Sequence, residues 1–201
     1  MATKKGHEIP TIDVVLVTIK PNDSEVEIAL DTASQIQVSP QTESEDAVKL
    51  IVKGRLIAQK PSTTTITGNT ITLKDNVFNA ELVKILQGGT VKFWTDAQKT
   101  TEGDEDTGNG VSSYTPPVAG SSDKGQVSTL CAYSAIYDAA GIITGYEKIE
   151  YPNCQGVPVA FGSEDGAFRA PEYTVNSAPK DGQAPYKISY IKPDSLPKAT
   201  A

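Results

Sequence analysis

The sequence has little of the chemistry that most catalytic and metal sites need. Its 201 residues include one histidine, two cysteines and one tryptophan, and aromatic residues make up 6% of the chain. The single histidine, His7, lies in a polar N-terminal segment, so we expect no Ser-His-Asp or Cys-His catalytic system. Cys131 and Cys154 form no CxxC pair, which argues against zinc and redox motifs and indicates two idle, buried thiols.

Carboxylates are the one catalytic residue type that is plentiful. A pair of them could hydrolyse a glycoside, but sugar clefts use aromatic stacking platforms, and this sequence supplies few. No GxGxxG or GxxxxGK[ST] segment offers a phosphate cradle. The acidic run Glu102, Asp104, Glu105 and Asp106 lacks EF-hand spacing and predicts a solvated loop. We therefore expect no enzyme activity, no cofactor and no metal.

Charge and hydropathy narrow the class of protein further. The chain has 18 Lys and Arg against 25 Asp and Glu, a net charge of −7, which is unsuited to direct nucleic-acid binding because phosphates attract cations. No apolar run approaches 18 residues, and the N-terminus leads into no apolar segment, so neither a membrane span nor a signal peptide is expected. A hydrophobic content of 38% suits one core, which predicts a single domain over 1–201.

Alternation of apolar and polar residues predicts several strands. In 25–31, three aliphatic residues alternate with Glu25, Glu27 and Asp31, as in a strand with one acidic, solvated face. Further strands are predicted where the same alternation or apolar enrichment recurs, at 13–19, 34–38, 48–53, 90–94, 127–136, 142–151, 155–161, 173–175 and 186–191. Of these, 13–19 and 48–53 are the richest in apolar residues, which predicts deeper burial, and Trp94 is a predicted packing anchor.

Two local signals are stronger than the rest. Two Thr/Ile runs flank Gly68-Asn69, which predicts a tight β-hairpin over 64–73. The only helical period follows, ending at Gly88-Gly89, with a cap from Asp75, Asn76 or Asn79. Its apolar side, about three turns long, comprises Val77, Phe78, Leu82, Ile85 and Leu86.

Three segments lack periodicity and are predicted to lie outside the core. They are an N-terminal arm at 1–11, a long polar insertion loop at 96–126 and a C-terminal tail at 192–201. Together with the strands they predict a mainly β protein, an antiparallel β-sandwich or barrel with one flanking α-helix and long arms.

Two stretches of this order resemble a known family. TITGNTITLKDNVFNAELVKILQGGTVKFW (65–94) and FRAPEYTVNSAPKDGQAPYKISYIKPDSLP (168–197) are similar to the major tail tube proteins of long-tailed bacteriophages. The resemblance implies homo-hexameric rings that stack into a hollow tube in the virion, made in the bacterial cytoplasm, with DNA as transient cargo. It also implies tape measure, tail terminator and tip proteins as partners.

On that resemblance, residues can be given candidate roles. Glu25, Glu27 and Asp31 are candidates for an acidic lumen wall that repels phosphate. The candidate inter-subunit contacts lie in or directly after the N-terminal segment 1–11, in the insertion loop and in the last strand: Ile9, Ile12, Tyr114 and Tyr190.

Other functions fit the same pattern. The inner tube of a phage-derived contractile device would share the fold and deliver no genome. A surface adhesin or carbohydrate-binding sandwich would need an export signal and an exposed aromatic cluster, and neither is evident. A capsid decoration or spike protein would be a trimer or a monomer.

Overall fold

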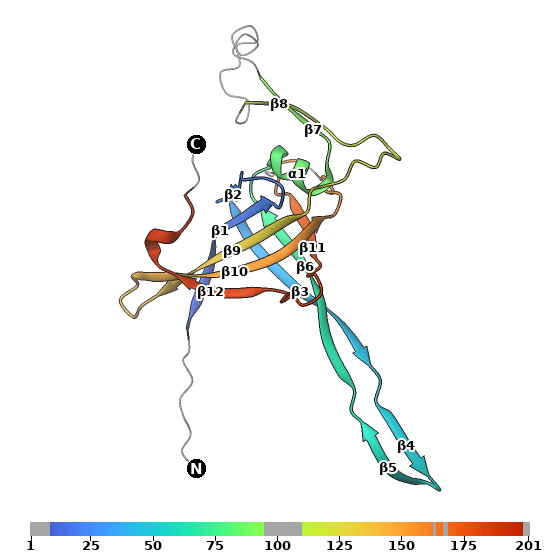
Figure 1. The fold of residues 1–201 in the computed structure, drawn as a ribbon. Coiled ribbons are helices and arrows are strands. Elements are labelled where there is room, and N and C mark those ends of the chain that lie inside the picture. Colours follow the sequence, from blue (N-terminus) through green and yellow to red (C-terminus); the bar gives the residue numbers. More distant parts are fainter. Residues whose placement is uncertain (1–8, 95–109, 163, 167–168, 199–201) are drawn as a thin grey trace.

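An eight-stranded antiparallel sheet forms the body of the protein, which confirms the mainly β fold class (Figure 1). The computed structural model describes residues 9–94, 110–162, 164–166 and 169–198. The strand order is β2-β1-β9-β10-β11-β6-β3, and β12 pairs with β10 outside this path. The bounds of these strands are β1 Thr11–Pro21, β2 Ile28–Leu30, β3 Ala33–Glu45, β6 Thr63–Asp75, β9 Ser128–Tyr137, β10 Ile143–Gly156, β11 Glu172–Ser177 and β12 Lys187–Ile191.

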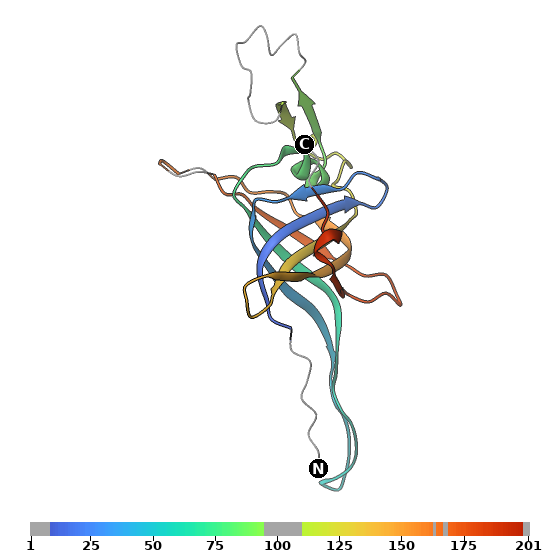
Figure 2. The ribbon, with the colours of Figure 1, turned by 90° about the vertical axis from the view of Figure 1, so that its left-hand side faces the viewer.

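The sheet curls around one apolar core, so that β1 and β3 come into contact (Figure 2). Period-two alternation directs one face of each strand inward, where the side chains are removed from water. Tyr173 is the largest fully buried side chain, and its hydroxyl accepts a hydrogen bond from the backbone N–H of Asn79 at 3.3 Å. The fully buried aliphatic residues around it are Val17, Ile19, Ile71, Leu73, Leu82, Val83, Leu86, Leu130 and Val175.

The predicted helix is present as α1 (Ala80–Gln87) and closes one end of the core. Asn79 caps it, since its side chain accepts from the N–H groups of Glu81 and Leu82, both at 3.0 Å. Gly88 ends it with a φ of 84°. The helix is shorter than predicted, because the chain becomes helical only at Ala80 and Val77 stays exposed.

The predicted hairpin at Gly68-Asn69 is wrong, because β6 runs through both residues as one continuous strand. It pairs with β3 along one edge and with β11 along the other. A side chain at Gly68 would collide with the backbone carbonyl of Ser177. Glycine is therefore present for close approach of two strands, next to a register shift between Gln41 and Thr42, and not for a turn.

The prediction of a deeply buried strand at 48–53 is also wrong. This segment contains β4 (Val48–Val52), which pairs with β5 (Arg55–Lys60) in a separate two-stranded sheet whose residues are all exposed. The turn between them is Lys53-Gly54, with φ of 50° and 76°, as two-residue hairpin loops require. The aliphatic run was informative about strand formation but not about burial.

Smaller differences concern where strands begin and end. The strand predicted for 25–31 covers only β2, and Val26 is exposed. The strand predicted for 155–161 ends with β10 at Gly156. Part of the predicted insertion loop is β8 (Val111–Thr115), which pairs with β7 (Thr90–Phe93).

The remaining predicted strands are confirmed as β1, β3, β7, β9, β10, β11 and β12, although β3 continues to Glu45 and β10 to Gly156, well beyond the predicted ends at 38 and 151. Cys131 and Cys154 are buried free thiols, as expected. His7, the acidic run at 102–106 and most of the N-terminal arm lie outside the described residues. The C-terminal segment contains a 3-10 turn at Pro193–Ser195. Within the described part, no helix is long and apolar enough to cross a membrane.

Candidate assembly surfaces

A two-stranded ribbon projects from the body and, among the residues that the structure describes, carries a concentration of exposed aliphatic side chains (Figures 1 and 2). It consists of residues 42–66, in which the ends of β3 and β6 continue into the β4–β5 hairpin. We call this ribbon the arm. Every residue of it is exposed except Ala47, which is half-buried. A two-stranded ribbon is at best marginally stable alone, so the arm needs either the body or a partner to hold its shape.

The outer half of the arm carries aliphatic side chains on both faces. Leu50 lies opposite Ala58 on one face, and the next pair, Ile51 and Leu56, lies on the other. No part of the described chain covers either face, since six of these side chains are 48% to 65% exposed: Val48, Leu50, Ile51, Val52, Leu56 and Ile57. Contiguous apolar surface of this kind marks an interaction site.

The tip of the arm is also basic, on a chain that is acidic overall. Residues 48–57 contain Lys49, Lys53 and Arg55 and no acidic residue. The acidic residues of the arm lie nearer the body, where Glu45 forms an ion pair with Lys60 at 2.8 Å. The tip therefore offers a combined aliphatic and cationic surface, which we call the arm tip.

The arm is anchored to the body by a buried amide. Asn69 is 1% exposed, and its Nδ2 donates to the hydroxyl of Ser177 and to the carbonyl of Pro185, both at 3.1 Å. These bonds join β6 to β11 and to the loop before β12, directly beside the point where β6 leaves the body. The base of the arm is thus held in one direction relative to the sheet.

A pocket lies at the opposite end of the same two strands. It has a volume of about 240 Å³ and is formed by the end of β2, the start of α1 and the β7–β8 hairpin. Asp31 and Glu81 are exposed there, and Val77 and Phe93 are each 52% exposed. Its lining includes no Lys or Arg and comprises Ala29, Leu30, Asp31, Thr32, Asp75, Val77, Phe78, Asn79, Ala80, Glu81, Phe93 and Val111. We call it the end pocket.

Two polar groups of the end pocket are already used within the chain. The carboxylate of Asp75 accepts from the hydroxyl of Thr32 and, at 2.8 Å, from the backbone N–H of Asn76. The N–H groups of Glu81 and Leu82 at the start of α1 are bonded by the Asn79 cap, so these two donors are not available to an anion. Asp31 and Glu81 are left as the exposed charges of the pocket.

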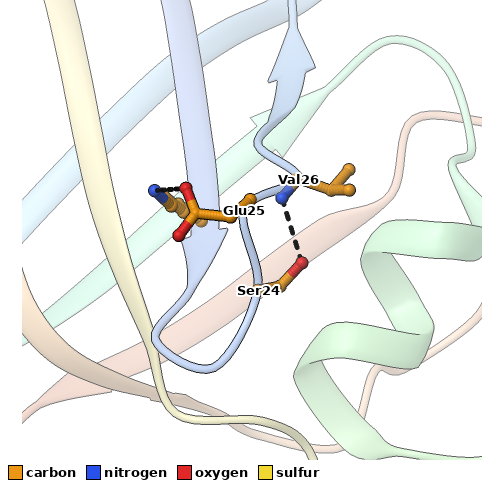
Figure 3. Close-up of polar contacts among 4 residues, drawn as sticks. Ser24, Glu25 and Val26 are labelled. Carbon is orange, nitrogen blue, oxygen red and sulfur yellow. Dashed lines mark hydrogen bonds and ion pairs between the residues drawn. The ribbon is translucent and has the colours of Figure 1, made fainter.

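The three residues predicted to line a lumen do not share one strand face. Glu25 and Glu27 lie in the loop between β1 and β2, and Asp31 follows β2 at the end pocket. Figure 3 shows the local geometry: the N–H of Val26 donates to the hydroxyl of Ser24 at 3.0 Å, and Glu25 pairs with Lys20 at 3.3 Å. The strand interpretation of this acidic set is wrong, while its place in an assembly stays a prediction.

The predicted inter-subunit residues differ in their exposure and in the contacts they already make within the chain. Ile9, Ile12 and Tyr190 are exposed, Ile12 at the start of β1 and Tyr190 on β12. Tyr114 is half-buried, and its hydroxyl donates to the carbonyl of Gly88 at 2.8 Å and accepts from Gln87 at 2.7 Å. Tyr114 therefore holds β8 against the end of α1 in the single chain.

Strand β12 offers a further surface along its outer edge. It pairs with β10 through Tyr146–Glu150, and no other described strand pairs with it. Ile188 and Tyr190 are exposed on it. An unpaired edge of this kind can accept a strand from another chain.

Among the described residues, no group of three His, Cys, Asp or Glu side chains is placed to hold a metal ion. Burial raises the pKa of the Cys154 thiol to about 12, so this thiol is protonated and unreactive near neutral pH. The surfaces that the geometry does supply are suited to association.

The arm tip is the feature that sequence reasoning missed. Its signal was available in Lys53-Gly54, a glycine-containing pair between two aliphatic runs of similar length. The tight turn was predicted at Gly68-Asn69 instead, because that pair carries the stronger turn signal.

The sequence matches no protein-family profile and no curated protein sequence. In fold, the chain is similar to a chain of the anti-feeding prophage baseplate, with 8% identity, a TM-score of 0.35 and 94% and 97% of the two chains covered. It is similar to a chain of the anti-feeding prophage tube-terminating cap, with 12% identity, a TM-score of 0.39 and coverages of 94% and 95%.

A third similarity is to a chain of the sheath-tube complex of an extracellular contractile injection system in its extended state. There the identity is 13%, the TM-score is 0.35, and 92% and 93% of the two chains are covered. At TM-scores below 0.5, these likenesses are too distant to carry a functional argument.

Proposed function

We propose that this protein is a structural subunit of the tail tube of a long-tailed bacteriophage. In the proposed assembly, six copies form a ring, and rings stack into a hollow tube through which DNA passes into the host. The observation that carries the proposal is the arm, an exposed aliphatic ribbon that is anchored to the body at its base and projects away from it.

The apolar surface of the arm can contribute substantially to association. Full burial of an exposed aliphatic side chain contributes about 1.5–3 kcal/mol, and the six aliphatic residues of the arm are 48% to 65% exposed, so together they offer on the order of 5–10 kcal/mol. Association of two proteins costs an estimated 4–15 kcal/mol in lost motion, which is of similar size. Contacts of several copies at once would make the balance favourable.

The placement of the surfaces supports stacking. The arm and the end pocket lie at opposite ends of β3 and β6, and the outer edge of β12 lies on another side of the body. Contacts between unlike surfaces of identical copies close into rings or extend into open filaments, according to the rotation between copies. A tube of stacked rings needs both kinds of contact: one that closes six copies into a ring, and one that adds rings along an open stack.

The finer features of the proposal come from the resemblance to tail tube proteins. They are the six-fold ring, the virion location, and the tape measure, terminator and tip proteins as partners. An acidic channel wall from Glu25 and Glu27 would repel DNA phosphates, which suits DNA as cargo rather than as ligand. The inner tube of a phage-derived contractile device would use the same surfaces, and a neighbouring sheath gene would distinguish it.

The arm can be tested by weakening its apolar faces. Ile51→Ser with Leu56→Ser should raise the protein concentration needed for assembly at least tenfold, because two aliphatic groups are lost from opposed positions. The measurement is sedimentation velocity over a concentration series.

A matched control uses an aliphatic residue of equal exposure elsewhere. Ile142 is 62% exposed in the β9–β10 turn, against 59% for Ile51, so Ile142→Ser should leave assembly unchanged. An equal effect of both changes would mean that the arm has no special role.

A further inference from the structure

We propose that the arm tip of one copy of this chain seats in the end pocket of a second copy. This inference rests on the proposed function and deepens it by naming the two surfaces that meet. The two surfaces are residues 48–57 on one copy and the cavity between β2, α1 and the β7–β8 hairpin on the other.

The geometry requires that the two surfaces come from different copies. Ala33 pairs with Asp75 beside the end pocket, Glu45 pairs with Thr63 at the far end of the β3–β6 pair, and the hairpin of β4 and β5 lies beyond it. From Ala33 to Lys53, β3 and β4 together extend over 20 residues, on the order of 60 Å at about 3.3 Å per residue. The arm tip points away from α1 in both views (Figures 1 and 2). It cannot reach its own pocket while these strands stay paired.

The charges of the two surfaces are complementary. The arm tip carries Lys49, Lys53 and Arg55 and no carboxylate, while the end pocket presents Asp31 and Glu81 and its lining includes no Lys or Arg. Arg169 stands near one wall, but its guanidinium stacks on the rings of Phe78 and Phe161, 5.1 and 4.5 Å from their centres. Such pairing favours one register and one partner.

The apolar groups also match. The pocket exposes Val77 and Phe93, and the arm tip exposes aliphatic side chains on both faces of a narrow hairpin. A volume of about 240 Å³ exceeds the ~150 Å³ in which other proteins hold a benzene-sized group. One or two side chains beside the Lys53-Gly54 turn would therefore fit.

Two consequences follow for the assembly. The contact joins unlike surfaces at opposite ends of the molecule, so repetition adds copies along the ribbon direction and gives an open stack. Asp31 takes part in the contact between stacked copies instead of lining the channel.

Reciprocal charge reversal tests the pairing in the full-length chain. Lys53→Glu with Arg55→Glu, and separately Asp31→Lys with Glu81→Lys, should each raise the concentration needed for assembly about tenfold or more. The four changes combined should return it to within about threefold of the wild type, because the pair is restored with opposite sign. Circular dichroism and thermal melting check that each variant is folded. Additive loss in the combined variant would overturn the proposal.

Covalent trapping provides a readout that does not depend on charge. Val52→Cys on one preparation and Val77→Cys on another should form a disulfide-linked heterodimer on mixing and oxidation, since the native Cys131 and Cys154 are buried. Val52→Cys with Ile142→Cys should give none. Equal linkage in both mixtures would overturn the proposal.

The outcomes separate this inference from the proposed function. Wild-type tubes that depend on Ile51 and Leu56, but are insensitive to the pocket changes, would overturn the pairing and leave the tube function standing. Absence of any wild-type assembly would contradict both. Binding of the arm tip to anionic phosphatidylglycerol vesicles, without self-association, would overturn the pairing in favour of a membrane partner.

Discussion

At the scale of single residues, the tightest packing surrounds the backbone of Leu86 at the end of α1. Gly125 and Gly156 approach it from two different segments, and a Cβ at either position would collide with it. Both glycines lack a positive φ, so space and not backbone conformation requires them. They are the points where the coil before β9 and the end of β10 close over the helix.

Gly156→Ala should therefore destabilise the protein by about 1–3 kcal/mol, the usual range for overpacking. Gly162→Ala is the matched control, because a Cβ there meets nothing within 4 Å and its φ is not positive. Urea unfolding followed by circular dichroism measures both. Equal stability of the two variants would contradict the packing account.

Two buried groups that can lose a proton, the Cys154 thiol and the Tyr151 hydroxyl, are a second feature at this scale. The thiol of Cys154 donates to the carbonyl of Tyr151 at 3.3 Å, and burial raises its pKa to about 12. Burial also raises the pKa of the Tyr151 hydroxyl to about 12. In the unfolded chain these groups titrate near 8.5 and 10.

The folded state therefore holds these protons more tightly, and stability should fall as pH rises. The contribution is complete below about pH 8.5 and is lost progressively toward pH 12. Cys154→Ala lowers stability at pH 7 through its cavity, but should flatten the decline between about pH 9.5 and 11.5 by up to ~1.4 kcal/mol per pH unit. Urea unfolding across this range tests it, and parallel curves for both proteins would contradict it.

At the scale of elements, the arm is an appendage whose removal should leave the body intact. Gln41 pairs with Gly68, so replacing residues 42–67 by Asn-Gly would join the two strands through a two-residue turn. No residue of the main core lies in the deleted segment. The shortened chain should melt cooperatively within a few degrees of the wild type by calorimetry and should not assemble. Loss of folding would show that the arm supports the body.

The elements that the sequence predicted well are those whose partners lie in the same chain. Alternation or apolar enrichment located β1, β3, β9 and β10, because their apolar side chains pack against other parts of the same chain. The helix was located by its apolar period and by the Gly88-Gly89 stop, and Asn79 is the one of the three predicted cap candidates that caps it. These signals need no knowledge of distant contacts.

The candidate site was predicted less well, because its signals depend on contacts that local patterns do not contain. An aliphatic run such as Val48–Val52 reads as buried, yet here nothing in the described chain covers it. Gly68 is typical of a turn, yet here glycine is needed because the backbone of Ser177, 109 positions away in the sequence, packs directly against it. The end pocket combines β2, α1 and β7, which no single segment reveals.

At the scale of the whole molecule, charge is unevenly distributed. The chain has a net charge of −7, while residues 48–57 carry three cations and no acid. The net negative charge disfavours contact between copies in general, while the basic tip favours contact with an acidic surface on a neighbour. The same arrangement disfavours tight binding of DNA to the body.

We propose above all that copies of this single chain assemble into a tube. Negative-stain microscopy of the purified wild-type chain, over rising concentration and at low and high salt, is the decisive measurement. We expect six-fold rings and hollow tubes of uniform diameter, absent when residues 42–67 are replaced by Asn-Gly. A wild-type chain that stays monomeric at every concentration and salt would contradict it.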